Sequence, residues 1–108
     1  MESLVSGLMP VVSPAEYFPS KNAVFWRTSA NGGFVQELHF RANSKFGWSY
    51  YAWVGWRDAG DEIRDHGWYR IPGLDDSVYA STDEAKIAAD FDAVQRGFTG
   101  ASPWKSAV

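Results

Sequence analysis

The stretch Ala23–Trp56, AVFWRTSANGGFVQELHFRANSKFGWSYYAWVGW, decides the fold. Two runs rich in β-branched and aromatic residues, Ala23–Thr28 and Phe34–Ala42, flank an Asn-Gly-Gly sequence at 31–33. An Asn-Gly step supplies the positive φ angles that a tight hairpin needs. The stretch therefore begins with a predicted antiparallel hairpin.

The next two strands differ in how their side chains alternate. Successive side chains of a strand point to opposite faces of the sheet. In the second strand one face is apolar (Phe34, Leu38, Phe40) and the other mixed (Val35, Glu37, His39, Arg41). After a second hairpin loop at 43–47, the third strand Trp48–Trp56 has Trp48, Tyr50, Val54 and Trp56 on one face and Tyr51 and Trp53 on the other. Both faces of this third strand are therefore predicted to be aromatic.

Residues 1–22 form an N-terminal arm that contains three prolines, so any regular structure in it has to be short. Within the arm, Ser13 and Glu16 have the spacing of a capping box, with proline at the first helical position. The arm is therefore expected to hold one short helical turn, Pro14–Phe18.

Downstream, Arg57–Gly67 is rich in Asp, Glu and Gly without an apolar period, which indicates an exposed loop. The sequence Ser-Thr-Asp-Glu at 81–84 is a capping box and predicts a helix over Thr82–Arg96, ended by Gly97. Three large apolar residues at helical spacing, Ile87, Phe91 and Val94, are expected to pack this helix against the sheet.

These elements predict an α+β fold: an antiparallel sheet of three to five strands with one C-terminal amphipathic helix packed on one face. The 108 residues are expected to form a single domain. It consists of the arm 1–22, a folded body 23–98 and a loose C-terminal tail 99–108.

Composition excludes several functions. The net charge of −3 disfavours a dominant attraction to nucleic acid, and the lack of cysteine excludes disulfides and cysteine-based metal sites. The two histidines, His39 and His66, belong to no recognised ligand or catalytic motif. No enzyme activity, metal or cofactor is therefore assigned. The sequence also shows no membrane span and no signal peptide, so a cytoplasmic protein is expected.

The second face of the predicted sheet is the candidate binding surface. It gathers Trp26, His39, Arg41, Tyr51, Trp53 and Arg57. Tryptophan, tyrosine and arginine dominate protein interfaces, and an exposed aromatic face is an aggregation liability without a partner. This pattern favours a small non-enzymatic binding protein that forms a homodimer or binds and regulates a larger protein. An equal alternative is that the N-terminal arm, including Tyr17 and Phe18, folds over this face and closes it.

Two further functions stay open. Aromatic and arginine side chains on a sheet also suit nucleic acid. Three antiparallel strands followed by a helix, over Ala23–Gly97, resemble in layout the small sheet-reading DNA-binding modules of the integrase-arm type, and the stretch from Ile71 to Ala85 is similar to antitoxins of the HicB type. A small-ligand pocket is the other alternative, lined by Trp48, Trp56, Trp68 and Tyr69.

Overall fold

A computed structural model describes residues 15–41, 44–57, 63–73, 76–98 and 100–107, and for residues 55–57, 63–66 and 77 it describes the backbone alone. The elements within these ranges are β1 (Ala23–Thr28), β2 (Phe34–Phe40), β3 (Phe46–Arg57), β4 (Ile63–Arg70), β5 (Asp76–Tyr79), α1 (Thr82–Gln95) and β6 (Lys105–Ser106). The α+β fold with a C-terminal helix on an antiparallel sheet is confirmed, and the sheet has six strands rather than three to five.

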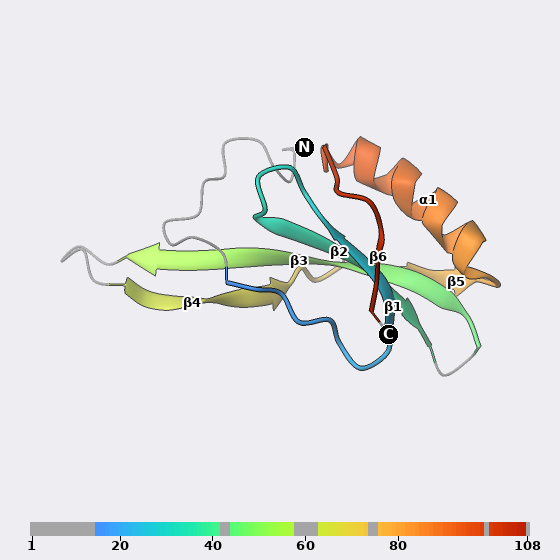
Figure 1. The fold of residues 1–108 in the computed structure, drawn as a ribbon, viewed down its shortest axis with the longest axis horizontal. Helices are drawn as coiled ribbons and strands as arrows, with labels where there is room; N and C mark the ends of the chain where they lie inside the picture. The colour runs from blue at the N-terminus through green and yellow to red at the C-terminus, as the bar shows by residue number, and fades with distance from the viewer. Residues whose placement is uncertain (1–14, 42–43, 58–62, 74–75, 99, 108) are drawn as a thin grey trace.

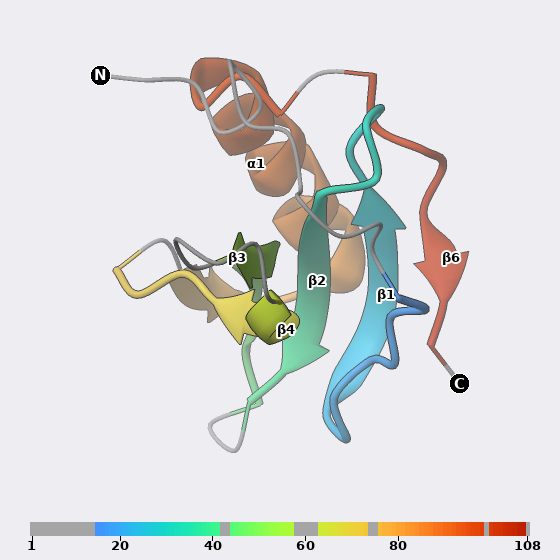
Figure 2. The same ribbon diagram turned by 90° about the vertical axis from the view of Figure 1, so that its left-hand side faces the viewer.

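The sheet is antiparallel throughout, in the order β4-β3-β2-β1-β6, and β5 also pairs with β3. Figures 1 and 2 show α1 on one side of the sheet, with β4 and β6 at its two edges. The prediction of a loop over Arg57–Gly67 was wrong from Ile63 onward, because β4 begins there. The 12-residue β3 is long enough to pair with both β4 and β5 along one edge.

The predicted first hairpin is present, although its loop is longer than a two-residue turn. The amide of Ser29 donates to the carbonyl oxygen of Phe34 at 2.9 Å, which closes a loop over residues 30–33. Gly32 has a φ of +72°, where glycine is favoured, and the side-chain oxygen of Asn31 accepts from the amide of Gly33 at 2.9 Å. The Asn-Gly pair thus makes the turn as the sequence indicates.

Both ends of the described chain differ from expectation. Residues 15–20 contain no helical turn, and Pro14 lies outside the described residues. The tail is docked rather than loose: the amides of Ser102 and Ala107 donate to the carbonyl oxygens of Thr28 and Val24, both at 2.9 Å. β6 then extends the sheet beside β1, because that strand's outer edge offers unpaired backbone groups.

The helix begins as its capping box predicts. Ser81 Oγ accepts from the amide of Glu84 at 3.2 Å, and Glu84 Oε2 accepts from the amide of Ala80 at 3.2 Å. α1 ends at Gln95, before Gly97 with a φ of +75°. Across the ranges that the structure describes, no helix is both long and apolar enough to cross a membrane.

The face that α1 turns to the sheet is not the predicted one. The buried helix residues are Ala85, Ala89 and Ala93. In contrast, Ile87, Phe91 and Val94 are 72%, 67% and 72% exposed. The prediction that these three large residues form the helix–sheet core was therefore wrong.

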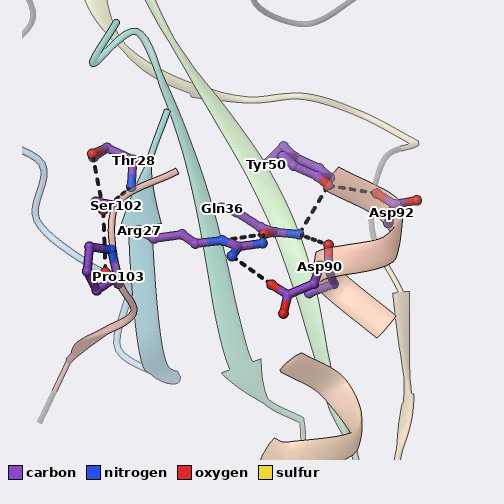
Figure 3. Close-up of polar contacts among 9 residues, drawn as sticks. Arg27, Thr28, Gln36, Tyr50, Asp90, Asp92, Ser102 and Pro103 are labelled. Carbon is purple, nitrogen blue, oxygen red and sulfur yellow. Dashed lines mark hydrogen bonds and ion pairs between the residues drawn. The ribbon is translucent and has the colours of Figure 1, made fainter. Parts of the chain in front are cut away.

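The sheet itself explains this rotation of the helix. It presents bulky side chains to α1, with Phe34, Trp48 and Tyr50 in one core cluster, and small alanines let the helix approach them closely. Polar contacts then fix the rotation. Gln36, which is fully buried, donates to the carbonyl oxygen of Ala89 at 3.2 Å, and the Tyr50 hydroxyl donates to Asp92 at 2.7 Å (Figure 3). Burying Phe91 instead would break both contacts.

Arg27 joins the helix to the docked tail. Its Nε and Nη2 donate to Gln36 Oε1 at 2.9 and 2.6 Å, and its Nη1 lies 2.7 Å from Asp90 of α1 (Figure 3). The guanidinium also lies 4.2 Å from the ring centroid of Trp104. One buried arginine thus connects β1, β2, α1 and the C-terminal segment.

Candidate functional site

The predicted binding surface lies on the sheet face opposite α1, and Tyr17 lies across it. The Tyr17 ring centroid is 5.4 Å from that of Trp26, 5.6 Å from that of Tyr51 and 5.4 Å from that of Trp68. We call this surface, made of Tyr17, Trp26, Tyr51, Trp53 and Trp68, the Tyr17 face. Residues 15–20 therefore cover part of the aromatic surface that the sequence left open to two interpretations.

A buried carboxylate anchors this cover. Glu37 is fully buried, and it accepts hydrogen bonds from the hydroxyls of Tyr17 and Ser20 and from the amide of Ser20 at 3.1 Å. Burial, with the neighbouring Glu37 carboxylate, raises the pKa of Tyr17 above its usual range, so the phenol stays a hydrogen-bond donor. Three donors around one carboxylate hold the segment against the sheet.

The predicted surface residues differ in exposure. Trp26 and Tyr51 are half-buried, and Trp53 is 8% exposed with its ring centroid 5.4 Å from that of Trp68. Arg41 is half-buried beside the second hairpin loop. The backbone of Arg57 ends β3, and its side chain lies outside the described residues.

His39 is 3% exposed, and its Nε2 lies 3.0 Å from Ser49 Oγ. Burial lowers the pKa of His39, so the imidazole is neutral near pH 7. A hydrogen-bonded serine and histidine can serve as nucleophile and general base in catalysis. Here both side chains are only 3% exposed and therefore lack access to a substrate.

A recess of about 550 Å³ remains on the Tyr17 face. Its walls are Ala15, Glu16, Tyr17, Trp26, Thr28, Asn31, Gly32, Trp68 and Lys105. Lys105 Nζ lies 4.5 Å from the ring centroid of Trp26, a cation–π distance. The recess carries one cation and one carboxylate, so its charge selects no ligand class.

Trp48 and Trp68 do not share the aromatic pocket predicted from Trp48, Trp56, Trp68 and Tyr69. Trp48 belongs to the core under α1, whereas Trp68 contacts Tyr17 on the opposite face of the sheet. Trp68 pairs with Trp53 across β3 and β4, and Trp48 lies five residues before Trp53 in β3, so the rings of Trp48 and Trp68 point to opposite faces of the sheet. The side chain of Trp56 lies outside the described residues.

The most exposed apolar side chains of α1 form a second candidate site. Ile87, Phe91 and Val94 are spaced i, i+4 and i+7, so they line one side of the helix. We call them the outer stripe. Contiguous apolar patches of more than a few hundred Å² are uncommon on monomeric proteins and mark interaction sites.

A groove of about 630 Å³ runs beside the outer stripe, between α1 and β5. It is lined by Trp48, Asp76, Tyr79, Glu84, Ile87, Ala88, Phe91 and Asp92. We call it the α1–β5 groove. The rings of Trp48 and Tyr79 stack with centroids 5.4 Å apart and planes 19° apart. The groove thus combines stacked aromatic rings with three carboxylates.

The groove's carboxylates also hold the fold together. Asp92 accepts from Tyr50 and from Arg96 Nε at 2.7 and 2.8 Å, and Asp76 Oδ2 accepts from the Tyr79 hydroxyl at 3.2 Å. Glu84 is exposed and caps the helix through Oε2. The described lining contains no lysine or arginine, and Arg96 beside it pairs with Asp92.

Sequence reasoning assigned the outer stripe to the core because large apolar residues at helical spacing usually face inward. One feature of the sequence favours the opposite side of the helix as the buried face. Ala85, Ala89 and Ala93 form an equally regular i, i+4 row on the opposite side of the same helix. Small residues permit close packing against a crowded sheet, so this row is a signal that could have identified the buried face.

Within the described residues, no group of three or more histidine, cysteine, aspartate or glutamate side chains is placed to hold a metal ion. Comparison with protein-family models, with curated proteins and with solved structures finds no match to this chain.

Proposed function

We propose that this protein is a small non-enzymatic protein-binding module and that the outer stripe of α1 is its interface. The observation that carries the proposal is the exposure of Ile87, Phe91 and Val94, at 72%, 67% and 72%. A helix presents such a row to a hydrophobic partner surface in many peptide and protein complexes.

The choice of the outer stripe over the Tyr17 face follows from availability. On the Tyr17 face, Trp53 is 8% exposed and Tyr17 itself is 8% exposed. Partner binding there would first require residues 15–20 to leave the Glu37 carboxylate, at the cost of one buried and two part-buried hydrogen bonds. The outer stripe requires no such rearrangement.

A regulatory role in the cytoplasm fits this proposal. The sequence has no cysteine, which suits a reducing compartment. A 108-residue module with one exposed helix row can occupy a groove on a larger protein and block it.

Self-association is the second candidate, favoured by the spacing of the stripe. In an antiparallel pair around a two-fold axis near Phe91, Ile87 of one copy meets Val94 of the other, so the stripe is complementary to itself. The salt dependence of the dimer's affinity is a further test of self-association. The surroundings of the stripe are acidic, so a dimer of two such surfaces strengthens as salt screens their repulsion.

The test compares the wild-type protein with two serine variants as affinity baits. Phe91→Ser removes the centre of the stripe, and Phe18→Ser removes an equally exposed ring, at 76%, elsewhere on the surface. A partner retained by wild type and by Phe18→Ser but lost from Phe91→Ser is then purified, and its affinity is measured. We expect Phe91→Ser to weaken binding at least tenfold, because truncating a central interface aromatic costs about 2 kcal/mol or more.

Light scattering over a concentration series measures self-association in the same three proteins. A dimer that dissociates in Phe91→Ser assigns the stripe to the second candidate. The proposal is contradicted if the wild type is monomeric and every retained protein binds Phe91→Ser as strongly as it binds the wild type.

A further inference from the structure

Residues 15–20, which we call the covering segment, are held on the sheet mainly through one side chain. Tyr17 is the only buried residue between positions 15 and 22. The structure describes no helix or strand before β1, and a turn at 21–22 joins the covering segment to that strand. The turn is closed by a hydrogen bond from the amide of Ala23 to the carbonyl oxygen of Ser20, at 3.1 Å. Opening the turn and releasing Tyr17 therefore frees the segment while every described helix and strand stays in place.

The slot that Tyr17 fills requires a hydrogen-bond donor. Its walls are the rings of Trp26, Tyr51 and Trp68, from β1, β3 and β4. Its floor is the fully buried Glu37 carboxylate of β2. An apolar side chain in the slot would leave this carboxylate buried without a donor, which is unfavourable. Any other occupant therefore has to bring a donor to the position of the phenol oxygen.

We propose that the covering segments of two copies of this chain exchange, so that Tyr17 of each copy fills the slot of the other. A second copy brings the complete set of donors that Glu37 binds, which are the hydroxyl of Tyr17 and the hydroxyl and amide of Ser20. The exchanged dimer keeps all these contacts and gives up the turn and the independent motion of two molecules. Two slots and two segments match, so the assembly closes at two copies.

A tyrosine from an unrelated protein is a poorer occupant of the slot. The covering segment would stay tethered beside the slot and compete for it at a high effective concentration. In the exchanged dimer no such competitor remains, because the segment of each copy is engaged by the other. A second copy is therefore the occupant that we infer.

The length of the covering segment sets how close the two copies lie. Tyr17 is four residues before Lys21, and four extended residues span at most about 14 Å. The starts of the two β1 strands therefore lie near each other. Figures 1 and 2 show α1 on the other side of the sheet, so both outer stripes stay exposed.

The exchanged dimer would present two outer stripes at once. It therefore binds a partner with two matching sites more tightly than one copy does. This consequence rests on the proposed function, whereas the exchange itself does not.

The first test shortens the turn by deleting Lys21, so that Tyr17 no longer reaches the slot of its own chain. The deletion is made in the Phe91→Ser protein, which removes self-association through the outer stripe. We expect light scattering to show a dimer whose dissociation constant is at least about 100-fold lower than that of Phe91→Ser alone. Adding Tyr17→Ala is expected to abolish this dimer, whereas adding Phe18→Ala, at a residue 76% exposed, is expected to keep it.

The second test uses the wild-type chain. Equal amounts of isotope-labelled and unlabelled protein are unfolded together in urea, refolded at high concentration and separated into monomer and dimer fractions. Isotope-filtered NMR then asks whether the Tyr17 ring and the Trp68 indole, 5.4 Å apart, belong to the same chain. We expect Tyr17–Trp68 contacts between labelled and unlabelled chains in the dimer, and contacts within one chain in the monomer.

The inference is overturned if the Lys21 deletion folds, by circular dichroism, but stays monomeric, or if its dimer survives Tyr17→Ala. It is equally overturned if the wild type yields no dimer fraction, or yields one with contacts within single chains only. A deletion variant that does not fold leaves the decision to the wild-type spectra. The partner affinity of Phe91→Ser is measured separately, so a failed exchange leaves the proposed function standing, and a failed proposed function leaves the exchange standing.

Discussion

The Tyr17 face and the outer stripe are both rich in large apolar side chains, yet the chain closes the first and leaves the second open. On the Tyr17 face, a segment about twenty residues away in sequence lies across the sheet and is held by Glu37. On the outer stripe, three side chains remain at least 67% exposed. Apolar content alone therefore does not mark a binding surface. An apolar cluster stays available only if no other segment of the chain, such as residues 15–20 here, folds over it.

The buried polar groups explain why the two regions differ. Glu37 gives residues 15–20 a fixed position, and Gln36 and Tyr50 fix the rotation of α1 through Ala89 and Asp92. Glu37 and Gln36 are neighbours in β2 and point to opposite faces, so one strand anchors both coverings of the sheet. The outer stripe is exposed because the hydrogen bonds from Gln36 to Ala89 and from Tyr50 to Asp92 hold the opposite side of α1 against the sheet.

The largest expected effect comes from opening the closed region. Tyr17→Ala removes a ring that is 8% exposed and leaves the buried Glu37 carboxylate without its phenol partner. We expect the free energy of unfolding, measured by urea denaturation, to fall by about 3–5 kcal/mol. The matched variant Phe18→Ala removes a ring that is 76% exposed and is expected to change it by less than about 0.5 kcal/mol. Similar small losses from both variants would show that Tyr17 does not seal the sheet.

A smaller effect tests the rotation of the helix. Ala89 is fully buried against the sheet, so Ala89→Leu adds three carbon atoms where the structure has no room. Overpacking of this kind costs about 1–3 kcal/mol in the free energy of unfolding. Val94→Leu adds one carbon atom on the outer stripe, at a residue 72% exposed, and is expected to be neutral within about 0.5 kcal/mol. The reverse order of the two costs would mean that Val94 faces the core, as the sequence suggested.

The smallest effect depends on pH and on His39. Burial lowers the pKa of His39 in the folded protein, whereas the unfolded chain takes up a proton near pH 6.5. The unfolded state therefore binds more protons below that pH, and stability falls as pH falls. Between pH 7.5 and 5.5 the loss from this group is at most about 1.4 kcal/mol.

His39→Gln is the control for this pH dependence, because glutamine can still hydrogen-bond to Ser49 but does not titrate. The slope of unfolding free energy against pH, measured by urea denaturation from pH 7.5 to 5.5, is expected to flatten in the variant. An unchanged slope would show that His39 is solvated and titrates normally.

Much of the backbone arrangement was predictable from local chemistry. The first strand has the predicted bounds, Ala23–Thr28, since β-branched and aromatic residues lead into an Asn-Gly turn, and α1 starts at Thr82 as the Ser81 capping box indicates. β4 was missed because its first half falls within Arg57–Gly67, a stretch rich in Asp, Glu and Gly without an apolar period, so its strand depends on the edge that β3 offers.

The candidate site was less predictable, because it depends on contacts between residues far apart in sequence. The alanine row and the large apolar row of α1 have equal periodicity, and the choice between them is made by Gln36 and Tyr50 in the sheet. Likewise, the sequence could not decide between an open and a covered aromatic face, since the answer depends on Tyr17 reaching Glu37.

The solvent exposure of the two regions in the isolated protein can be compared in a single measurement. Methyl NMR with a soluble paramagnetic agent, at a concentration where light scattering shows a monomer, compares Ile87 and Val94 with Val35, which is fully buried on the Tyr17 face. We expect strong relaxation of the Ile87 and Val94 methyl groups and little relaxation of those of Val35. Protected Ile87 and Val94 methyl groups in the monomer would contradict it, because the outer stripe would then already be covered by the chain itself.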